Sequence, residues 1–467
     1  MKLNKAALPL LTLALALPCA SVGLAESPLE LTEIPEERFF SNPCAVRDIG
    51  DPHVLPANGE YFTFATGGPI GFNVWRSSDL TVFTKEKAMK KAAWASGDHW
   101  APEVYPWQGR YVMLFTARRS SDQSLRIGIA FADEPQGPYE DPLGEPLFDF
   151  GYAAIDGTLV CDDGGTPYLI YSRDCSENVV EDRHESHLYG VQLADNLLST
   201  VGEPVLLTKP DAPWETASGD YRWNEGPAVL RHDGRYYLFY SSNYFASKEY
   251  AVGVAVADHP LGPYVKQANN PLLSYVETDG TVLVSGPGHN SFFAVGDELF
   301  TAYHTHTYPL APSGNRQLCI DRVGFHADGT AYVSGPTLAP QLRPLNDLGL
   351  VNHIPAAAKG DGAPLADGDI CCAASSGDYV WTGEQTSFSW ETPVQADMLL
   401  LYPAEGSAVT GRAIINDMWT ADFAQDANAA PGQAVVLSFE ATDVTKLELL
   451  FDGESRIGEV MLLGKGA

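Results

Sequence analysis

The 467-residue chain has few basic side chains, since 29 Lys and Arg stand against 60 Asp and Glu, for a formal net charge of −31. A chain this acidic repels polyanions, which argues against nucleic acid or an anionic membrane surface as a partner. A neutral ligand such as a carbohydrate is compatible with this charge.

Long apolar runs are absent after the N-terminus. Residues 6–20 form the one such run, with Lys2 and Lys5 before it and small residues after it. The run is too short to span a bilayer, and its pattern is typical of an export signal. We therefore predict residues 1–25 as a signal peptide, no membrane span, and a secreted or periplasmic mature chain. The alternative is a lipid anchor at Cys19.

Cysteines are few and scattered, which excludes a clustered metal site. An exported chain can form disulfides, but the spacing leaves the pairing open. The histidines His304 and His306 lack further ligands nearby, so zinc is disfavoured. The six cysteines that follow Cys19 are Cys44, Cys161, Cys175, Cys319, Cys371 and Cys372.

Helical periodicity is scarce between residues 43 and 345, where apolar residues alternate with period two between Gly, Pro, Asn and Asp turns. Five stretches there repeat one layout: an acid or Gly-Pro entrance, a short apolar strand, a Gly-bearing turn and an aromatic-rich strand. Their spacing of roughly fifty to seventy residues suits one propeller blade each. The sequence thus predicts an all-β, five-bladed propeller over residues 26–345. The stretches run over residues 51–64, 101–115, 156–171, 225–240 and 286–303.

The rest of the chain predicts a second domain. Residues 346–376 are rich in Ala, Gly and Asp and are predicted as a linker. Residues 377–467 again alternate as strands, with the size of a β-sandwich. This accessory domain carries no evident catalytic cluster, so support or weak carbohydrate binding is its expected role.

Three acids open three different blades: Asp51, Asp156 and Glu225. The innermost strands of a propeller begin near one mouth of the channel, so we expect these acids to converge. Glycoside hydrolysis needs one protonated and one ionised carboxyl group beside the scissile bond. A third carboxylate raises the pKa of the acid by like-charge repulsion. The pattern therefore favours a glycosidase.

The entrance motifs, taken in this order, resemble those of glycoside hydrolase family 43, five-bladed propeller enzymes that act on arabinose- and xylose-containing polysaccharides. The resemblance covers residues 43 to 345 and implies that Asp51 is the general base, Glu225 the general acid, and Asp156 the residue that tunes the pKa of the acid. The family inverts, which implies carboxyl groups about 6.5–9.5 Å apart. The motifs are Gly50-Asp51-Pro52-His53, Trp100-Ala101-Pro102-Glu103-Val104, Ile155-Asp156-Gly157-Thr158-Leu159, Glu225-Gly226-Pro227 and Gly288-His289-Asn290-Ser291.

Other assignments carry alternatives. Asp48 competes with Asp51 as the base. The resemblance implies that Trp100 is a sugar platform, with ordinary core packing as the alternative, and that Glu103 is structural. It also implies that Arg316 lies near the acids, with a surface position as the alternative, and that His289 lies near a calcium ion or water cluster on the channel axis. No organic cofactor is expected.

The sequence thus predicts a secreted, inverting glycoside hydrolase for arabinofuranosyl or xylosyl linkages in plant-type polysaccharides or oligosaccharides. The alternatives are a non-catalytic carbohydrate-binding propeller and a propeller glycosidase for galactose or fucose. Sugar, linkage and endo or exo action depend on loops, and residues 173–187 and 209–222 have the character of such insertions. The sequence does not fix their shape.

Overall fold

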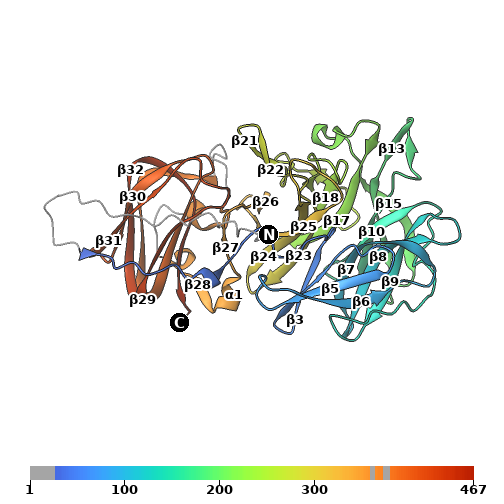
Figure 1. Ribbon diagram of the computed structural model, residues 1–467, viewed down its shortest axis with the longest axis horizontal. Coiled ribbons are helices and arrows are strands. Elements are labelled where there is room, and N and C mark those ends of the chain that lie inside the picture. Colours follow the sequence, from blue (N-terminus) through green and yellow to red (C-terminus); the bar gives the residue numbers. More distant parts are fainter. Residues whose placement is uncertain (1–26, 358–362, 372–378, 467) are drawn as a thin grey trace, which may run out of the picture.

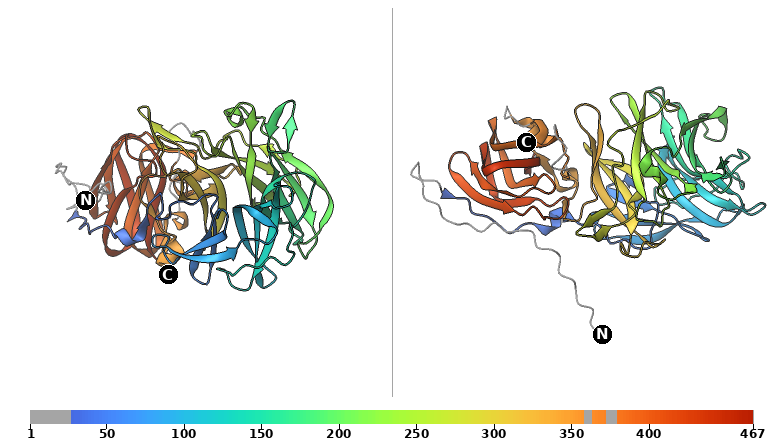
Figure 2. Two further views of the ribbon diagram at one scale, coloured as in Figure 1. Left: turned by 45° about the vertical axis from the view of Figure 1, so that its right-hand side comes forward. Right: turned by 90° about the horizontal axis from the view of Figure 1, so that it is seen from above.

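The computed structural model describes residues 27–357, 363–371 and 379–466. They form two β-rich bodies that lie side by side along the long axis of the molecule (Figure 1), and the right view in Figure 2 shows the same two bodies from above. The predicted signal peptide with Cys19, and also Cys372, lie outside the described residues. Within those residues, no helix has the length and apolarity needed to cross a membrane.

The first body is a propeller of five sheets in the described chain, which confirms the predicted fold class. Blade 1 is β3 (His53–Ala57), β4 (Glu60–Phe64), β5 (Gly71–Ser77) and β6 (Thr84–Lys90). Blade 2 is β7 (Ala95–Trp107), β8 (Arg110–Arg119) and β9 (Leu125–Ala132). Blade 3 is β10 (Ala154–Cys161), β11 (Pro167–Arg173), β14 (His187–Leu193) and β15 (Thr200–Thr208). Blade 4 is β17 (Asn224–His232), β18 (Arg235–Ser242), β19 (Ala251–Ala257) and β20 (Val265–Lys266). Blade 5 is β23 (Gly288–Val295), β24 (Glu298–His306), β25 (Arg316–Phe325) and β26 (Ala331–Ser334).

Smaller elements decorate the propeller. The predicted insertions form a small sheet of β12 (Val179–Val180), β13 (Arg183–Glu185) and β16 (Tyr221–Arg222). A hairpin of β21 (Val276–Thr278) and β22 (Thr281–Val284) follows blade 4. The short helices η1 (Glu36–Arg38) and η2 (Pro213–Thr216) lie in connections.

Apolar side chains fill each junction between neighbouring blades. Because side chains alternate along a strand, one strand serves two junctions. In β8, Met113 and Phe115 pack against blade 1, whereas Val112 and Leu114 pack against blade 3. Inner strands such as β8 and β18 therefore have both faces buried, which explains the aromatic-rich runs in the sequence. The remaining junctions are filled in the same way.

The chain ahead of blade 1 closes the ring. Cys44 N–H donates to the carbonyl of Leu318 at 2.8 Å, and Leu318 N–H donates to Val46 at 3.2 Å. Next to them, β2 (Phe39–Phe40) pairs with β27 (Gln341–Leu342). This segment covers the part of the β25 edge that β26 leaves open, which protects it from pairing with another chain.

Asp321 anchors this closure. Its carboxylate accepts hydrogen bonds from Asn42 Nδ2 at 3.0 Å, Tyr303 Oη at 2.6 Å, Gln341 Nε2 at 2.6 Å, and both the hydroxyl and the backbone N–H of Thr337 at 2.6 and 3.2 Å. The donors come from the N-terminal segment, from blade 5 and from the connection that follows it. One buried carboxylate thus joins three separate pieces of chain.

Replacing Asp321 with asparagine is expected to lower the free energy of unfolding by about 2–4 kcal/mol. The substitution replaces one carboxylate oxygen with an NH₂ group, so the donors that bonded this oxygen lose their acceptor and face another donor. Urea unfolding measures the loss. The matched control is Asp133→Asn, which removes one partner of an ion pair with Arg110 where the Asp133 side chain is 83% exposed. We expect no measurable change for the control, and an equal effect of the two substitutions would contradict the role of Asp321.

The second body is the predicted β-sandwich. Along β29, Leu399 and Leu401 face its core, whereas Met398 and Leu400 pack in a cluster with Phe39 and other residues on the propeller side. The apolar run in this strand is therefore continuous because both of its faces are buried. The strands are β1 (Ser27–Pro28), β28 (Leu350–Asn352), β29 (Trp381–Pro403), β30 (Val409–Ile415), β31 (Trp419–Gln425) and β32 (Val435–Lys465).

The domain boundaries remain a proposal, and two details refine them. Residues 27–31 lie on the sandwich, because β1 pairs with β31 and Leu31 forms a bridge with Phe439. The segment 346–376, predicted as a linker, is structured in its described part because Ile354 and Leu365 pack into the sandwich core. Its elements are the end of α1 (Leu345–Leu348), then β28, η3 (Ile354–Ala356) and η4 (Ala363–Ala366).

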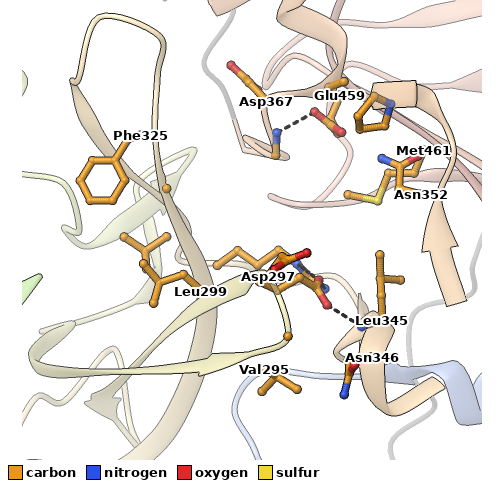
Figure 3. A pocket seen from close by; sticks show the side chains of 18 of the residues that line it. Val295, Asp297, Leu299, Phe325, Leu345, Asn346, Asn352, Asp367, Glu459 and Met461 are labelled. Carbon is orange, nitrogen blue, oxygen red and sulfur yellow. Dashed lines mark hydrogen bonds and ion pairs between the residues drawn. The ribbon is translucent and has the colours of Figure 1, made fainter. Parts of the chain in front are cut away.

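A cavity of about 760 Å³ lies between the two bodies (Figure 3). Glu298 on its propeller side accepts the Leu345 N–H at 2.5 Å, and Glu459 on its sandwich side accepts the Gly368 N–H at 2.9 Å. Burial raises the pKa of Glu459 well above its usual range. None of the three acids that open the blades lines this cavity, so its volume does not mark the candidate site.

Candidate active site

Each innermost strand of the propeller is associated with one residue in left-handed backbone conformation, which lies two residues before β3, in the middle of β7, and within the first three residues of β10, β17 and β23. In four blades the strand pairing shifts register at this point, which is the signature of a β-bulge. Bulges turn a side chain away from the regular alternation of the strand. The five entrance motifs of the sequence are therefore equivalent positions in the fold. The residues are Asp51 (φ 55°), Ala101 (φ 43°), Asp156 (φ 56°), Gly226 (φ 55°) and His289 (φ 51°).

A chain of contacts joins the three acids. Gly226 N–H donates to Asp156 Oδ2 at 3.1 Å. Gly226 also lies against His289, since a Cβ at this glycine would stand 3.0 Å from the imidazole ring. His289 Nδ1 is in turn 3.3 Å from Asp51 Oδ1. With Glu225 directly before Gly226, the structure brings Asp51, Asp156 and Glu225 together from three blades.

Asp51 is surrounded by groups that stabilise its charge. Arg316 Nη1 donates to Asp51 Oδ1 at 2.7 Å, and the Thr66 hydroxyl donates to Oδ2. Burial alone raises the pKa of Asp51, but the Arg316 guanidinium, the neighbouring imidazole of His289 and the Thr66 hydroxyl together hold this pKa well below its usual range. Asp51 is therefore ionised at neutral pH, the state that a general base requires.

The approach of Arg316 to Asp51 depends on Gly50, because a Cβ there would lie 2.0 Å from the Arg316 Cζ. The competing candidate, Asp48, has an exposed side chain. The geometry therefore favours Asp51 over Asp48, and it brings Arg316 to the acid cluster rather than to an open surface position.

Glu225 is in the opposite electrostatic state. Its side chain is buried, and Tyr250 Oη donates to Glu225 Oε1 at 2.8 Å. Burial, followed by the negative charges of Asp156 and Asp174, raises the pKa of Glu225 well above its usual range. The raised pKa favours the protonated form of Glu225, which is the form that a general acid requires.

Asp156 lies between these two states. Burial raises the pKa of Asp156 to about 6, with His289 lowering it and Asp51 raising it. Its backbone N–H donates to Thr116 Oγ1 at 2.9 Å, which fixes the bulge. Above this pKa, Asp156 is an anion beside Glu225.

Replacing Asp156 with asparagine is expected to shift the alkaline limb of the kcat/KM profile to lower pH. The anion of Asp156 disfavours ionisation of Glu225, so removing that charge lowers the pKa of Glu225 and the acid loses its proton sooner. Asparagine retains an oxygen that can accept the Gly226 N–H. The measurement is kcat/KM against pH, with Asp163→Asn on the exposed turn of the same blade as the control. An alkaline limb that stays in place would contradict the tuning role.

The structure gives Trp100 and Glu103 different surroundings. Trp100 is half-buried against Leu125 and Ile155, one residue ahead of the bulge, the position that Glu225 takes in blade 4. Its sugar-platform role stays a prediction. Glu103 is buried and accepts a hydrogen bond from the Tyr105 hydroxyl, and burial raises its pKa to about 8.

Among the described residues, no three His, Cys, Asp or Glu side chains are grouped to hold a metal ion. His304 Nδ1 accepts the Asp51 N–H at 3.2 Å, and His306 bonds Ser285 Oγ at 2.8 Å and the Phe245 carbonyl at 2.9 Å.

Three residues of the site escape the sequence reasoning. They are Thr66, Tyr250 and His304, which contact Asp51 or Glu225 from loops and strands outside the entrance motifs. Only His304 gives a signal, as a histidine that follows the apolar and aromatic residues Ala302 and Tyr303 of β24. A single Tyr or Thr beside a strand gives none.

The sequence pattern of glycosyl hydrolases family 43 matches residues 40–331. The chain is 27% identical over 316 residues to a β-D-galactofuranosidase of Aspergillus niger, covering 62% of this chain and 83% of the relative. It is also 27% identical over 316 residues to an extracellular exo-α-(1→5)-L-arabinofuranosidase of Streptomyces avermitilis, covering 62% of each chain.

Solved structures give a similar result. A thermostable family-43 glycoside hydrolase superposes with a TM-score of 0.62 at 41% identity, covering 65% of this chain and 99% of that one. An endo-1,4-β-xylanase of Bacteroides thetaiotaomicron superposes with a TM-score of 0.54 at 29% identity, covering 64% of this chain and 97% of that one. The family match to residues 40–331 covers most of the propeller and ends before the C-terminal body.

Proposed function

The chain belongs to glycosyl hydrolases family 43, and we propose that it hydrolyses arabinofuranosyl or xylosyl linkages by a single displacement at the acid cluster. Asp51 is the general base and Glu225 the general acid, and the charge of Asp156 adds to burial in raising the pKa of Glu225. Arg316 keeps Asp51 ionised. Trp100 is the sugar platform at the rim.

The proposed reaction follows from these protonation states. Ionised Asp51 takes a proton from a water molecule as its oxygen attacks the anomeric carbon, while Glu225 gives its proton to the departing glycosidic oxygen. The glycosidic bond breaks as the new bond forms on the opposite face of the sugar, so configuration is inverted. Afterwards Asp51 returns its proton to solvent and Glu225 regains one.

The observation that carries this proposal is the opposite pKa shift of two carboxyl groups in one contact-linked cluster. The pKa of Asp51 is lowered and that of Glu225 is raised, although both are buried. Two carboxyl groups whose environments push their pKa values apart define an acid and base pair. A propeller that only bound sugar would have no need of this difference.

The names of the relatives support two furanose substrates. The Streptomyces avermitilis relative acts on α-L-arabinofuranosyl units and the Aspergillus niger relative on β-D-galactofuranosyl units. The two sugars share a five-membered ring with the same ring configuration and differ in the exocyclic group. β-D-Galactofuranoside is therefore the second candidate substrate.

Hydrolysis of 4-nitrophenyl glycosides tests the proposal. We expect turnover of the α-L-arabinofuranoside or the β-D-xyloside, measured as kcat/KM, with the β-D-galactofuranoside as the comparison. Faster turnover of the galactofuranoside would transfer the assignment to the second substrate. Binding of pentose oligosaccharides with no turnover of any glycoside would support the non-catalytic alternative.

We also propose that a calcium ion is bound through water molecules near His289. The side-chain amide of Asn290, the next residue, is buried and both of its polar atoms lack a hydrogen-bond partner among the described residues. A hydrated cation would satisfy such atoms and stabilise the channel. Metal analysis of the purified protein, with unfolding temperature before and after chelation, tests it.

Export is proposed from residues 1–25, whose pattern is that of a signal peptide. N-terminal sequencing of the mature protein tests this. A chain that begins after the signal supports export, and a lipid-modified Cys19 would favour the anchored alternative.

A further inference from the structure

A row of aromatic rings runs from the small sheet of the insertions to the acid cluster. His184 stacks on Tyr221 with centroids 4.7 Å apart, Tyr221 on Trp223 at 6.0 Å, and Trp223 contacts Tyr244 at 5.6 Å. Tyr244 meets Phe245 at 5.0 Å. We name these five residues the aromatic row.

The inner end of the aromatic row touches the site. Phe245 lies under Arg316, whose Cζ is 5.0 Å from the ring centroid, and Arg316 bonds Asp51 at 2.7 Å. On the other side, Tyr221 and Trp223 precede Glu225 at alternate positions of an extended segment, so their side chains project to the same side of the chain. The aromatic row therefore borders the proposed base and the proposed acid.

The aromatic row is held in place by hydrogen bonds. The Phe245 carbonyl bonds His306 Nε2 at 2.9 Å, and His184 Nδ1 bonds the Cys175 carbonyl at 2.8 Å. Asn243 Nδ2, beside Tyr244, donates to the carbonyls of Trp214 and Glu249 at 2.8 and 3.0 Å. Binding would therefore require little ordering of these loops.

The outer part of the aromatic row faces solvent. Tyr221 is 47% exposed and Tyr244 is 45% exposed. Exposure of large apolar rings to water is unfavourable. A group of such rings beside a candidate site is therefore typical of a surface that binds a ligand. Packing of the blades does not require them, since none belongs to a junction between blades.

We propose that the aromatic row binds the polysaccharide chain that carries the hydrolysed residue, which makes the insertions a determinant of polymer specificity. This proposal rests on the proposed function, because it places the polymer next to the acid pair. C–H groups of the sugars lie against ring surfaces, and the Tyr hydroxyls bond sugar hydroxyls.

The expected polymer is neutral and pentose-rich. Asp182 and Asp220 are exposed beside the outer end of the aromatic row, and the whole chain carries a net charge of −31. The net charge of the protein disfavours a chain rich in uronic acids. Linear arabinan or the xylan chain of arabinoxylan has no such charge.

Affinity electrophoresis in gels that contain linear arabinan or arabinoxylan tests the proposal. The parent protein is Glu225→Gln, which removes the proposed acid and so prevents cleavage during the run. We expect one of the two polymers to slow the migration of this parent. Tyr221→Ala with Tyr244→Ala in the same background should raise the dissociation constant for that polymer about tenfold. The matched pair Tyr221→Phe with Tyr244→Phe keeps the rings and should recover most of the binding.

Kinetics in the otherwise unchanged enzyme add a second readout. The alanine pair should lose more kcat/KM on the polymer than on a 4-nitrophenyl pentoside, chiefly through KM. Equal mobility of parent and alanine pair, or a parent that neither polymer slows, would overturn the inference. A different result would separate the two proposals. If the polymer slows the parent but the unmutated enzyme hydrolyses no pentoside, polymer binding is supported and the proposed function is overturned.

Discussion

Glu225→Gln is expected to lower kcat on natural oligosaccharides by about 10²- to 10⁴-fold while the protein stays folded and still binds sugar. Glutamine has the shape of the protonated acid and can accept the Tyr250 hydroxyl as Glu225 does at 2.8 Å, but it cannot give up a proton. The loss should shrink on a 2,4-dinitrophenyl glycoside, because that leaving group departs without protonation. Initial rates on both substrates measure the difference.

Glu103→Gln is the matched control for that variant. Glu103 is also a buried glutamate on an innermost strand, and burial raises its pKa to about 8, so it is mostly protonated at neutral pH and glutamine replaces it closely. We expect near-normal activity. Full activity of Glu225→Gln on an oligosaccharide would rule out Glu225 as the acid.

Asp51→Asn is expected to lower kcat by a similar factor on every substrate, including those with good leaving groups. The base activates water in the step that all substrates share, so a better leaving group does not compensate for its loss. Loss of the charge also leaves Arg316, now bonded to Asp51 at 2.7 Å, without a carboxylate partner. Azide should restore turnover, since it attacks carbon without first losing a proton.

The control for the base is Asp48→Asn. Asp48 lies three residues before Asp51 but has an exposed side chain, so its charge is screened by solvent. We expect unchanged kcat and kcat/KM. Activity that is lost in Asp48→Asn and kept in Asp51→Asn would reverse the assignment.

Much of the fold was predictable from local pattern. The sequence of each blade contains the pattern of a hairpin with its own turn and aromatic-rich strand, so five copies of this pattern predict five blades. The placement of Asp51 and Asp156 at equivalent left-handed positions follows from the same repetition. These features need only information that lies within a few residues of each motif.

The remaining features depend on contacts between distant parts of the chain. Tyr250 reaches Glu225 from the start of another strand, and His304 reaches the backbone of Asp51 across 253 residues. No local pattern distinguishes this tyrosine from those in the blade junctions. The shape of the aromatic row was equally hidden, because it needs β13 to pair with β16, which places His184 opposite Tyr221.

The central claim is that Asp51 and Glu225 act on opposite faces of one bound sugar. Proton NMR of the first product formed from an α-L-arabinofuranosyl or β-D-xylosyl substrate tests it most directly, provided that spectra are recorded before the anomers equilibrate. The account predicts that the first-formed sugar has the opposite anomeric configuration to the substrate. A first-formed product of retained configuration would contradict it, because retention requires a carboxylate that attacks carbon instead of water.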